Sequence, residues 1–173
     1  MENYILKTVY KQLLADTITP VSIYLKLRDK FPNSILLESA DYQGNENSYS
    51  FICCNPIASI KVEDGLIKEV YPDGNTVIAK VDDVDLPERV QAFSRRFESV
   101  IDKSFNFIYN GLFGYTTYDA IRYFEDIEIS PSDPIKKIPD LFYSVYQYVI
   151  AVNHFKDELY LFEHLYLKDI LEE

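Results

Sequence analysis

A glutamate and a serine stand together at the end of an apolar run, where side chains of these types can bind an amino acid. The segment 36–40 reads LLESA, so that Glu38 and Ser39 follow two leucines. A carboxylate and a hydroxyl presented beside backbone groups are suited to hold the ammonium of an amino acid. Polar residues are also common wherever a strand turns, for reasons of turn chemistry alone. Both interpretations stay open on these residues by themselves.

The sequence offers little for catalysis. His154 and His164 are its two histidines, and no Ser or Cys stands in a recognisable nucleophile setting beside them. We expect both histidines at surface or edge positions near strand ends. The 5 glycines form neither a GxGxxG pattern nor a P-loop, so a phosphate cradle is not supported. No catalytic residue is assigned.

The two cysteines, Cys53 and Cys54, are adjacent. Neighbouring residues of a strand point to opposite faces, and a disulfide between them would need a strained turn. A CxxC redox motif and a zinc-ligand set are absent from the sequence. We expect reduced thiols, at least one of them buried, and no metal site in this chain.

Two kinds of pattern predict the elements that must position these residues. Residues 4–10 fit either a strand or a short helix. Thr19 is a suitable N-cap and Pro20 a suitable first helical residue, which predicts a helix over 20–30. Asp85 resembles a capping residue, and apolar residues then recur at helical spacing, which predicts a helix over 86–103 with Arg95, Arg96 and Glu98 facing solvent. A second short amphipathic helix is predicted over 118–124.

Strands and turns account for most of the remainder. A short strand is predicted over 34–39, followed by a loop over 41–47. The turn signals Asp64-Gly65 and 72–75 separate three predicted strands, at 57–63, 66–71 and 76–81. Further strands are predicted at 49–54, 105–113, 141–155 and 159–166, with a loop over 129–139. The sequence therefore predicts one α+β unit over 1–173, with a mostly antiparallel β-sheet and two or three flanking helices.

Composition and charge narrow the class of partner. The chain has 173 residues, of which 47% are hydrophobic and 26% are charged, values that are ordinary for a globular protein. Its 17 Lys+Arg against 28 Asp+Glu give a net charge of -11. An acidic surface repels phosphate backbones and anionic lipid, so nucleic acid and membrane are not expected partners. Without an apolar run of ~20 residues or a signal-peptide pattern, we expect a cytoplasmic protein.

Several segments, taken in order, resemble anthranilate synthase component I of the chorismate-utilising enzymes. The LLESA segment is similar to that family's LLES strand, and Ser48–Pro56 is similar to its RYSFIG-x-(D/N)P strand, with Ser48 where Arg is usual and Cys53 where Gly is usual. Ala15–Val21, Gly111–Asp119 and Arg122–Glu125 are similar to further family segments. Each segment is weak alone, but together they extend over nearly the whole chain.

The resemblance implies an N-terminal regulatory and scaffold part of a longer enzyme. In the family, the LLES and RYS strands form one wall of an allosteric L-tryptophan site, which maps onto Leu37, Glu38, Ser39 and Tyr49, with Ser39 as the first choice for a hydrogen bond. The C-terminal chorismate-binding domain, with its Mg²⁺-binding glutamates, is absent from these residues, so this chain alone is expected to be inactive. A glutamine amidotransferase, component II, is the implied partner.

Other interpretations remain open. Aminodeoxychorismate synthase component I, of the folate pathway, has a similar N-terminal region, although Leu37-Glu38-Ser39 favours the anthranilate branch. A stand-alone amino-acid-binding module and a structural fragment without a ligand are further alternatives. A fragment would expose apolar surface that is covered in the longer protein, so we also expect self-association or strand exchange.

Overall fold

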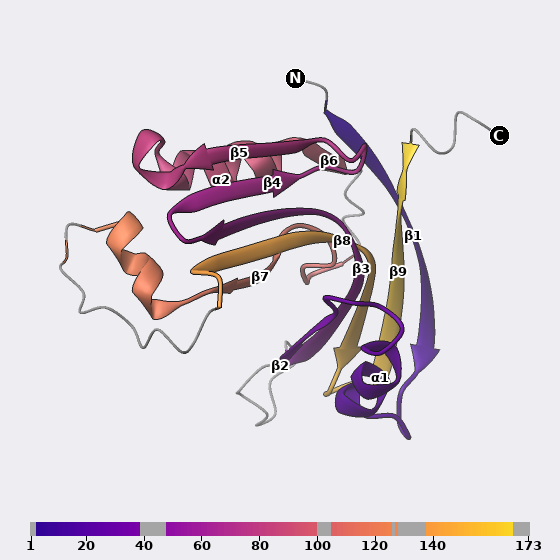
Figure 1. Ribbon diagram of the computed structural model, residues 1–173. Helices are drawn as coiled ribbons and strands as arrows, with labels where there is room; N and C mark the ends of the chain where they lie inside the picture. Colours follow the sequence, from indigo (N-terminus) through magenta and orange to yellow (C-terminus); the bar gives the residue numbers. More distant parts are fainter. Residues whose placement is uncertain (1–2, 39–47, 100–104, 126, 128–137, 168–173) are drawn as a thin grey trace. The chain divides into compact units, whose positions relative to one another are not determined.

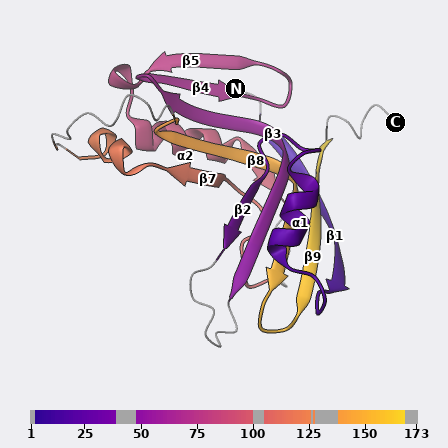
Figure 2. The ribbon, with the colours of Figure 1, turned by 60° about the horizontal axis from the view of Figure 1, so that its bottom comes forward.

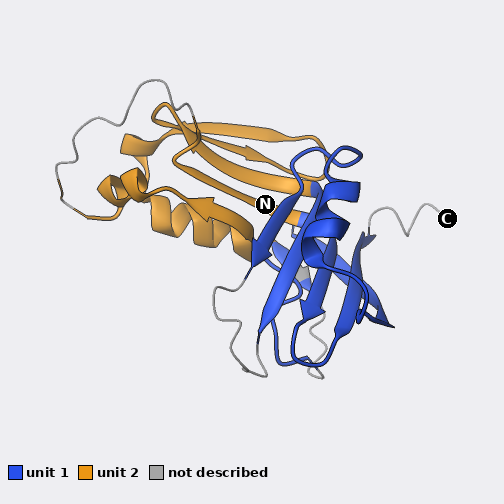
Figure 3. Cartoon of the chain, turned by 90° about the horizontal axis from the view of Figure 1, so that it is seen from below, with its two compact units in different colours: residues 1–56, 97–111, 146–173 blue, residues 57–96, 112–145 orange. Residues whose placement is uncertain are grey.

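The computed structural model describes residues 3–38, 48–99, 105–125, 127 and 138–167. These residues form two compact units, which Figure 3 shows in different colours. Unit 1 comprises residues 1–56, 97–111 and 146–173, and unit 2 comprises residues 57–96 and 112–145. Two long strands, β3 (Tyr49–Glu63) and β8 (Leu141–Asn153), contribute residues to both. The prediction that 1–173 is one N-terminal domain stays a prediction.

Nine strands and two α-helices make up most of the described part of the chain (Figure 1). The strands are β1 (Tyr4–Leu14), β2 (Ile35–Glu38), β3 (Tyr49–Glu63), β4 (Leu66–Val70), β5 (Thr76–Lys80), β6 (Phe97–Ser99), β7 (Phe113–Thr116), β8 (Leu141–Asn153) and β9 (Glu158–Tyr166). The helices are α1 (Pro20–Leu27) and α2 (Leu86–Arg95), with 3-10 turns η1 (Val81–Asp83) and η2 (Tyr118–Tyr123).

The strands follow the order β5-β4-β3-β8-β9-β1-β6, with β2 pairing with β3 and β7 with β8. β1 pairs with β6 in parallel. The pairs β1–β9, β2–β3, β3–β4, β4–β5, β7–β8 and β8–β9 are antiparallel. The predicted fold class, α+β with a mostly antiparallel sheet, is therefore confirmed.

In unit 1, α1 covers one face of the strands (Figure 2). The helix begins as predicted, because the Thr19 hydroxyl accepts a hydrogen bond from the Ser22 N–H at 3.2 Å and Pro20 occupies the first turn. Its apolar residues Ile23, Tyr24 and Leu27 pack on a buried cluster formed by Ala15, Ile52, Ile150, Val152 and Leu159. Leu36 of β2 joins this cluster. One face of β2 and β3 is therefore occupied by core packing.

The two strands predicted at 49–54 and 57–63 are one continuous strand, β3. Asn55 stands inside it with φ 58°, in the left-handed region that Asn tolerates better than most residues. The turn after β3 is as predicted: Asp64 and Gly65 have φ 50° and 72°, the pair of positive values that a type I′ hairpin requires.

In unit 2, α2 packs on β4. Asp85 caps it by accepting the Glu88 N–H at 2.8 Å, as predicted. Leu86 and Phe93 are buried, and the Phe93 ring lies 5.4 Å from that of Tyr71, which follows β4. The helix ends at Arg95, so the prediction of a helix to residue 103 is wrong: Phe97–Ser99 pairs with β1 as β6. Helical spacing of apolar residues cannot reveal a partner strand that lies far away in sequence.

Two further predictions in this region are wrong. Residues 105–112 are not a strand; the strand here is β7, Phe113–Thr116. Arg96 does not simply face solvent, because its guanidinium lies 4.0 Å from the centre of the Tyr71 ring. The predicted helix at 118–124 is present as the 3-10 turn η2. The loop regions predicted at 41–47 and over most of 129–139 lie outside the described residues.

β7 and η2 are held against the start of β8. A Cβ on Gly114 would overlap the backbone of Phe142 and Tyr143, so the close pairing of β7 with β8 requires glycine there. Arg122 donates to the Asp140 carboxylate at 2.7 Å, and the Tyr123 hydroxyl donates to the same oxygen at 2.7 Å. The sequence GLFGYTTYD and the RY that follows it thus have a structural role in unit 2.

Candidate functional site: an aromatic hollow in unit 1

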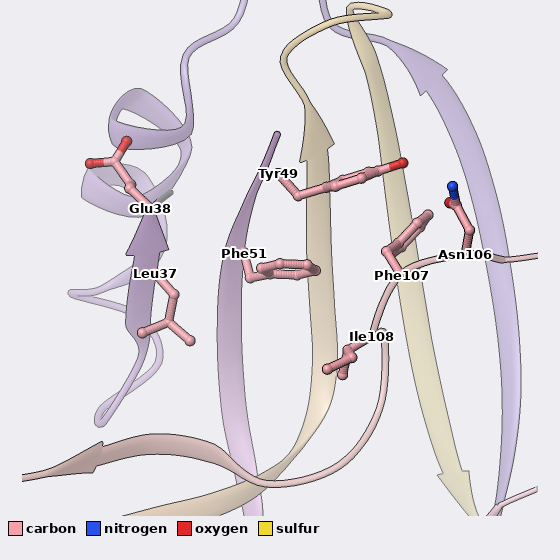
Figure 4. Close-up of a pocket in the computed structure, with 7 residues that line it drawn as sticks. All are labelled: Leu37, Glu38, Tyr49, Phe51, Asn106, Phe107 and Ile108. Atoms are coloured by element: carbon pink, nitrogen blue, oxygen red, sulfur yellow. The ribbon is translucent and has the colours of Figure 1, made fainter. Parts of the chain in front are cut away.

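Unit 1 has a hollow of about 440 Å³ beside the ends of β2 and β3. Ligand pockets in proteins commonly have ~300–1,000 Å³, so this one is large enough for a small molecule. Its lining comes from β2, β3 and the segment that follows β6 (Figure 4). The residues that line it are Leu37, Glu38, Tyr49, Phe51, Asn106, Phe107 and Ile108.

The register of β2 on β3 explains why three of these side chains share a face. Leu37 lies directly opposite Phe51, and opposed residues of an antiparallel pair project to the same side. Tyr49 is two residues from Phe51 and therefore projects to that side as well. Leu36 and Ile52 face the other side, where they join the cluster beneath α1. The hollow is thus lined by the face of β2 and β3 that α1 does not cover.

The segment 105–109 supplies the facing wall through its alternating aromatic residues. The Phe107 ring lies 4.5 Å from that of Tyr49, 5.4 Å from that of Tyr160 and 6.0 Å from that of Phe162. Phe105 packs edge-on against Phe162 at 5.1 Å. These contacts, and not strand pairing, hold the segment, since aromatic pairs at 4.5–7 Å attract one another beyond simple burial.

A buried histidine fixes the end of this segment. His164 is 3% exposed, so the prediction of a surface or edge position is wrong. Its Nε2 lies 3.0 Å from the Tyr109 carbonyl and must donate to it, so its Nδ1 accepts from the Thr8 hydroxyl at 2.8 Å. Burial lowers the pKa of His164, and the hydrogen bond to Tyr109 opposes this only in part. The neutral ring therefore fastens β9 both to β1 and to the wall segment.

His154 is also engaged within unit 1. Its Nε2 lies 2.7 Å from the hydroxyl of Ser50, which is fully buried, and its backbone N–H donates to the Ser48 carbonyl at 3.0 Å. Ser50 is opposite Glu38 in the register of β2 on β3. The Ser50 side chain and its partner His154 lie on the strand face opposite to Tyr49 and Phe51. They therefore support the strand ends and do not line the hollow.

The polar groups of the hollow lie at its edges. The Tyr49 hydroxyl accepts a hydrogen bond from Asn153 Nδ2 at 2.9 Å, and Asn153 is 1% exposed. Asn106 lines the hollow with an exposed amide. Near the aromatic wall, burial and donation to Glu158 raise the pKa of Tyr160 to about 12, so that hydroxyl stays protonated at neutral pH.

Three of the four residues predicted from sequence line the hollow together: Leu37, Glu38 and Tyr49. Figure 4 shows the Leu37 side chain and the Tyr49 ring toward the aromatic wall, and the Glu38 carboxylate directed to the opposite side. Ser39, the first choice for hydrogen bonding, lies outside the described residues.

Four lining residues were not assigned from sequence: Phe51, Asn106, Phe107 and Ile108. The alternation in FNFIY over 105–109 is typical of a strand and led to the wrong prediction there. In fact its alternate rings face the aromatic residues of β1, β3 and β9. Periodicity of two identifies which residues share a side, and leaves open whether the backbone pairs.

Unit 2 has its own polar cluster and a smaller hollow. Glu69 is 2% exposed and receives Arg89 Nε at 2.5 Å, Arg89 Nη2 at 3.0 Å and the Tyr71 hydroxyl at 2.5 Å. Burial, followed by the hydrogen bond to Glu69, raises the pKa of Tyr71 to about 12. The hollow, of about 240 Å³, is lined by Pro87, Val90, Leu112, Thr116, Phe124, Leu141 and Tyr143.

The described residues favour an aromatic binding surface over other kinds of site. In the described part of the chain, no three His, Cys, Asp or Glu side chains converge in a way that could hold a metal ion. No helix in the same residues is long and apolar enough to cross a membrane. Cys53 and Cys54 are both buried and unbridged. What the geometry offers is an aromatic surface with polar groups at its edges, suited to binding a flat, partly apolar molecule.

Comparison with known proteins identifies relatives, although no family model matches the chain. Anthranilate synthase component 1 of Lactococcus lactis subsp. lactis is 28% identical over 153 residues, which cover 88% of this chain and 31% of the relative. The Aquifex aeolicus protein of the same name is 33% identical over 134 residues, 78% of this chain and 26% of the relative. That of Pseudomonas putida is 33% identical over 153 residues, 86% of this chain and 30% of the relative.

Among solved structures, anthranilate synthase component I from Streptococcus pneumoniae TIGR4 matches with a TM-score of 0.45 and 24% identity, over 86% of this chain and 30% of that chain. The chain spans less than a third of the length of these curated relatives. The matches lie in the N-terminal part of the relatives. Over most of its length, the chain is therefore a relative of the N-terminal part of anthranilate synthase component I.

Proposed function

We propose that the hollow of unit 1 is one wall of an L-tryptophan feedback site, and that the chain is the regulatory and scaffold part of an anthranilate synthase component I. The observation that carries this proposal is the position of the hollow. It lies at the segment LLE, which resembles the tryptophan-binding strand of the family, and it is lined by aromatic rings. An indole ring is flat and largely apolar, and such rings pack well on Phe and Tyr.

The proposed role extends to the complete protein. There, a C-terminal chorismate-binding domain and a glutamine amidotransferase, component II, would convert chorismate and ammonia to anthranilate and pyruvate. Mg²⁺ would support that chemistry from residues of the C-terminal domain, as the resemblance implies. The names of the relatives favour the anthranilate branch over aminodeoxychorismate synthase.

Feedback requires only that bound tryptophan favour a state with poor chorismate turnover. A coupling of ~1–3 kcal/mol between the sites changes affinity by about 5–150-fold, which is enough for regulation. Glu38 and Ser39 are proposed to hold the ammonium of the amino acid, as the resemblance implies. Glu38 would have to turn for this, because Figure 4 shows its carboxylate directed away from the aromatic wall. Because the opposite wall would come from the C-terminal domain, we expect this chain alone to bind L-tryptophan weakly, with a Kd on the order of 1 mM.

The test is a titration of the chain with L-tryptophan, followed by calorimetry or by energy transfer from tyrosine, since the chain contains 15 Tyr and no Trp. We expect saturable binding that Leu37→Asn weakens severalfold. Leu66→Asn is the matched control, because Leu66 is an exposed residue of unit 2 outside the hollow. Absence of saturable binding, or equal loss in both variants, would refute the proposed wall.

A second arm uses the complete protein. Glu38→Ala and Ser39→Ala are expected to relieve inhibition by tryptophan while turnover of chorismate stays largely intact. If turnover fell in parallel with inhibition, these two residues would be structural, and the regulatory assignment would lose its support.

A further inference from the structure

The hydrogen bond between Asn153 and Tyr49 fixes which way the Tyr49 hydroxyl donates its proton. Asn153 Oδ1 accepts two backbone hydrogen bonds in the turn after β8, from the N–H of Phe155 at 2.9 Å and from that of Lys156 at 3.0 Å. Both partners are donors, so the atom that faces them must be the amide oxygen. The Asn153 side chain therefore has a single allowed orientation.

With the amide oxygen so placed, the Asn153 Nδ2 group faces the Tyr49 hydroxyl, at 2.9 Å. An amide nitrogen only donates, so the phenol oxygen must accept at this contact. Its own proton must point elsewhere. Within the described residues, Asn153 is the only hydrogen-bond partner of the Tyr49 hydroxyl. That proton is therefore available to a group that the hollow receives.

The position of the hydroxyl indicates what that group is. Tyr49 and Asn106 both line the hollow, and Figure 4 shows the Tyr49 oxygen toward the side where the Asn106 amide lies. Leu37, Phe51, Phe107 and Ile108 supply the apolar part of the lining. A ligand that fits this pattern has an aromatic body and a hydrogen-bond acceptor at one end.

Building on the proposed function, we infer that the Tyr49 hydroxyl donates to the carboxylate of the bound aromatic amino acid, and that Asn153 is the positioning residue that directs this proton. Asn153 does not line the hollow; it acts through Tyr49. The hollow consequently selects for ligands by their carboxylate, and not only by their ring.

The experiment compares three probes on the 173-residue chain: L-tryptophan, indole propionate, which has the carboxylate without the ammonium, and tryptamine, which has the ammonium without the carboxylate. Tyr49→Phe retains the ring and removes the hydroxyl. Because a hydrogen bond to a charged group is lost, we expect about tenfold weaker binding of the two carboxylates and unchanged binding of tryptamine. Tyr148→Phe, which removes a hydroxyl 3.2 Å from Glu163 and outside the hollow, is the control.

Asn153→Asp tests the positioning role. A carboxylate still accepts the N–H groups of Phe155 and Lys156, so the turn is retained, but its second oxygen now accepts the Tyr49 proton. We expect the preference for indole propionate over tryptamine to fall by about tenfold, the weight of one charge-assisted hydrogen bond. Adding Tyr49→Phe to Asn153→Asp is then expected to have little further effect. A residue with a merely structural role would weaken all three probes alike. Should Asn153→Asp not fold, the comparison on Tyr49→Phe decides alone.

The outcomes separate the two proposals. If the unmodified chain binds none of the three probes, the proposed tryptophan wall fails and this inference fails with it. If the chain binds them and Tyr49→Phe weakens all three equally, or none, the wall stands and the carboxylate assignment is overturned.

Discussion

The hollow in unit 1 and the polar cluster in unit 2 use similar side chains in opposite ways. In unit 2, Tyr71 donates a hydrogen bond to Glu69, and Arg89 binds both oxygens of that carboxylate. The three side chains are therefore hydrogen-bonded within one cluster. In unit 1, Tyr49 accepts from Asn153, and its ring lines a hollow. Both clusters have a tyrosine beside a phenylalanine, Tyr71 with Phe93 and Tyr49 with Phe107.

The difference shows how a structural cluster can be told from a binding site. A buried polar network in which each donor meets an acceptor stabilises the fold and leaves nothing to offer a ligand. A tyrosine ring that lines a hollow, with its hydroxyl proton directed away from its protein partner, presents both an apolar surface and a hydrogen-bond donor to a ligand. The same residue types therefore predict stability effects in unit 2 and binding effects in unit 1.

The largest contrast is expected from removing one aromatic ring in each unit. Phe93 is 1% exposed, and Phe93→Ala is expected to destabilise the chain by about 3–5 kcal/mol, since the lost contacts leave a cavity. Phe107 is half-buried beside the hollow, so Phe107→Ala is expected to cost less stability, about 1–2 kcal/mol. Phe107→Ala should nevertheless weaken L-tryptophan binding more than any substitution in unit 2 that still allows the chain to fold.

Urea unfolding curves and the tryptophan titration measure the two effects on the same samples. Equal losses of stability from the two substitutions would contradict the distinction between a packed core and an open wall.

The next effect concerns the ion pair of unit 2. Arg89→Met leaves the Glu69 carboxylate buried without its cation, which costs ~3–5 kcal/mol for a fully buried pair. Because the Arg89 side chain is 28% exposed, solvent screens part of this, and we expect a loss of about 2–3 kcal/mol. Arg95→Met, in the same helix but on its exposed side, is the matched control and should change stability by at most ~0.5 kcal/mol. Similar losses in both would show that the Glu69 cluster is not structural.

A smaller effect is expected from His164, which fastens the wall of the hollow. Its pKa is lowered in the folded chain by burial, so the unfolded chain binds the proton more readily. The stability contributed by the neutral ring is therefore present above its ordinary pKa of ~6.5 and is lost as the pH falls below it. Unfolding free energies measured from pH 7 to pH 5 should decline, and His164→Gln should make the decline shallower. Parallel pH profiles would contradict this role.

The last effect leaves stability aside and concerns the buried thiols of β3, which follow Phe51 along the strand. Burial raises the pKa of Cys54 to about 11, and burial together with the neighbouring Cys54 raises the pKa of Cys53 as well. Since the thiolate is the reactive form, modification at pH 8 should be at least about a hundredfold slower in the folded chain than in urea. Rapid modification of the folded chain would mean that the hollow continues along β3 past Phe51.

Local chemistry made much of the fold predictable. The caps at Thr19 and Asp85 and the turn at Asp64-Gly65 depend on residues within three positions of one another, and the structure confirms each. Where the prediction was wrong, the deciding partner is remote: β6 pairs with β1, more than 90 residues before it. Local pattern cannot register such a partner, because strand pairing is a tertiary effect.

The site shows the same division. Leu37 and Tyr49 were identified through a resemblance that is continuous in sequence, and both line the hollow. Phe107 and Asn153 could not be found that way, because both are remote from Tyr49 in sequence. Phe107, which packs on the Tyr49 ring, is 58 residues away, and Asn153, which donates to the Tyr49 hydroxyl, is 104 residues away. The burial of His164 depends likewise on Thr8 and Tyr109, 156 and 55 residues away.

The most direct test of the account is to map where L-tryptophan binds, by following the aromatic and methyl NMR signals of both units during a titration. The account predicts shifts at Leu37, Tyr49, Phe51, Phe107 and Ile108, all of which line the hollow in unit 1. Tyr71 and Phe93 in unit 2 should stay unchanged. Shifts centred on unit 2, or none at ligand concentrations well above the expected Kd, would contradict the central claim.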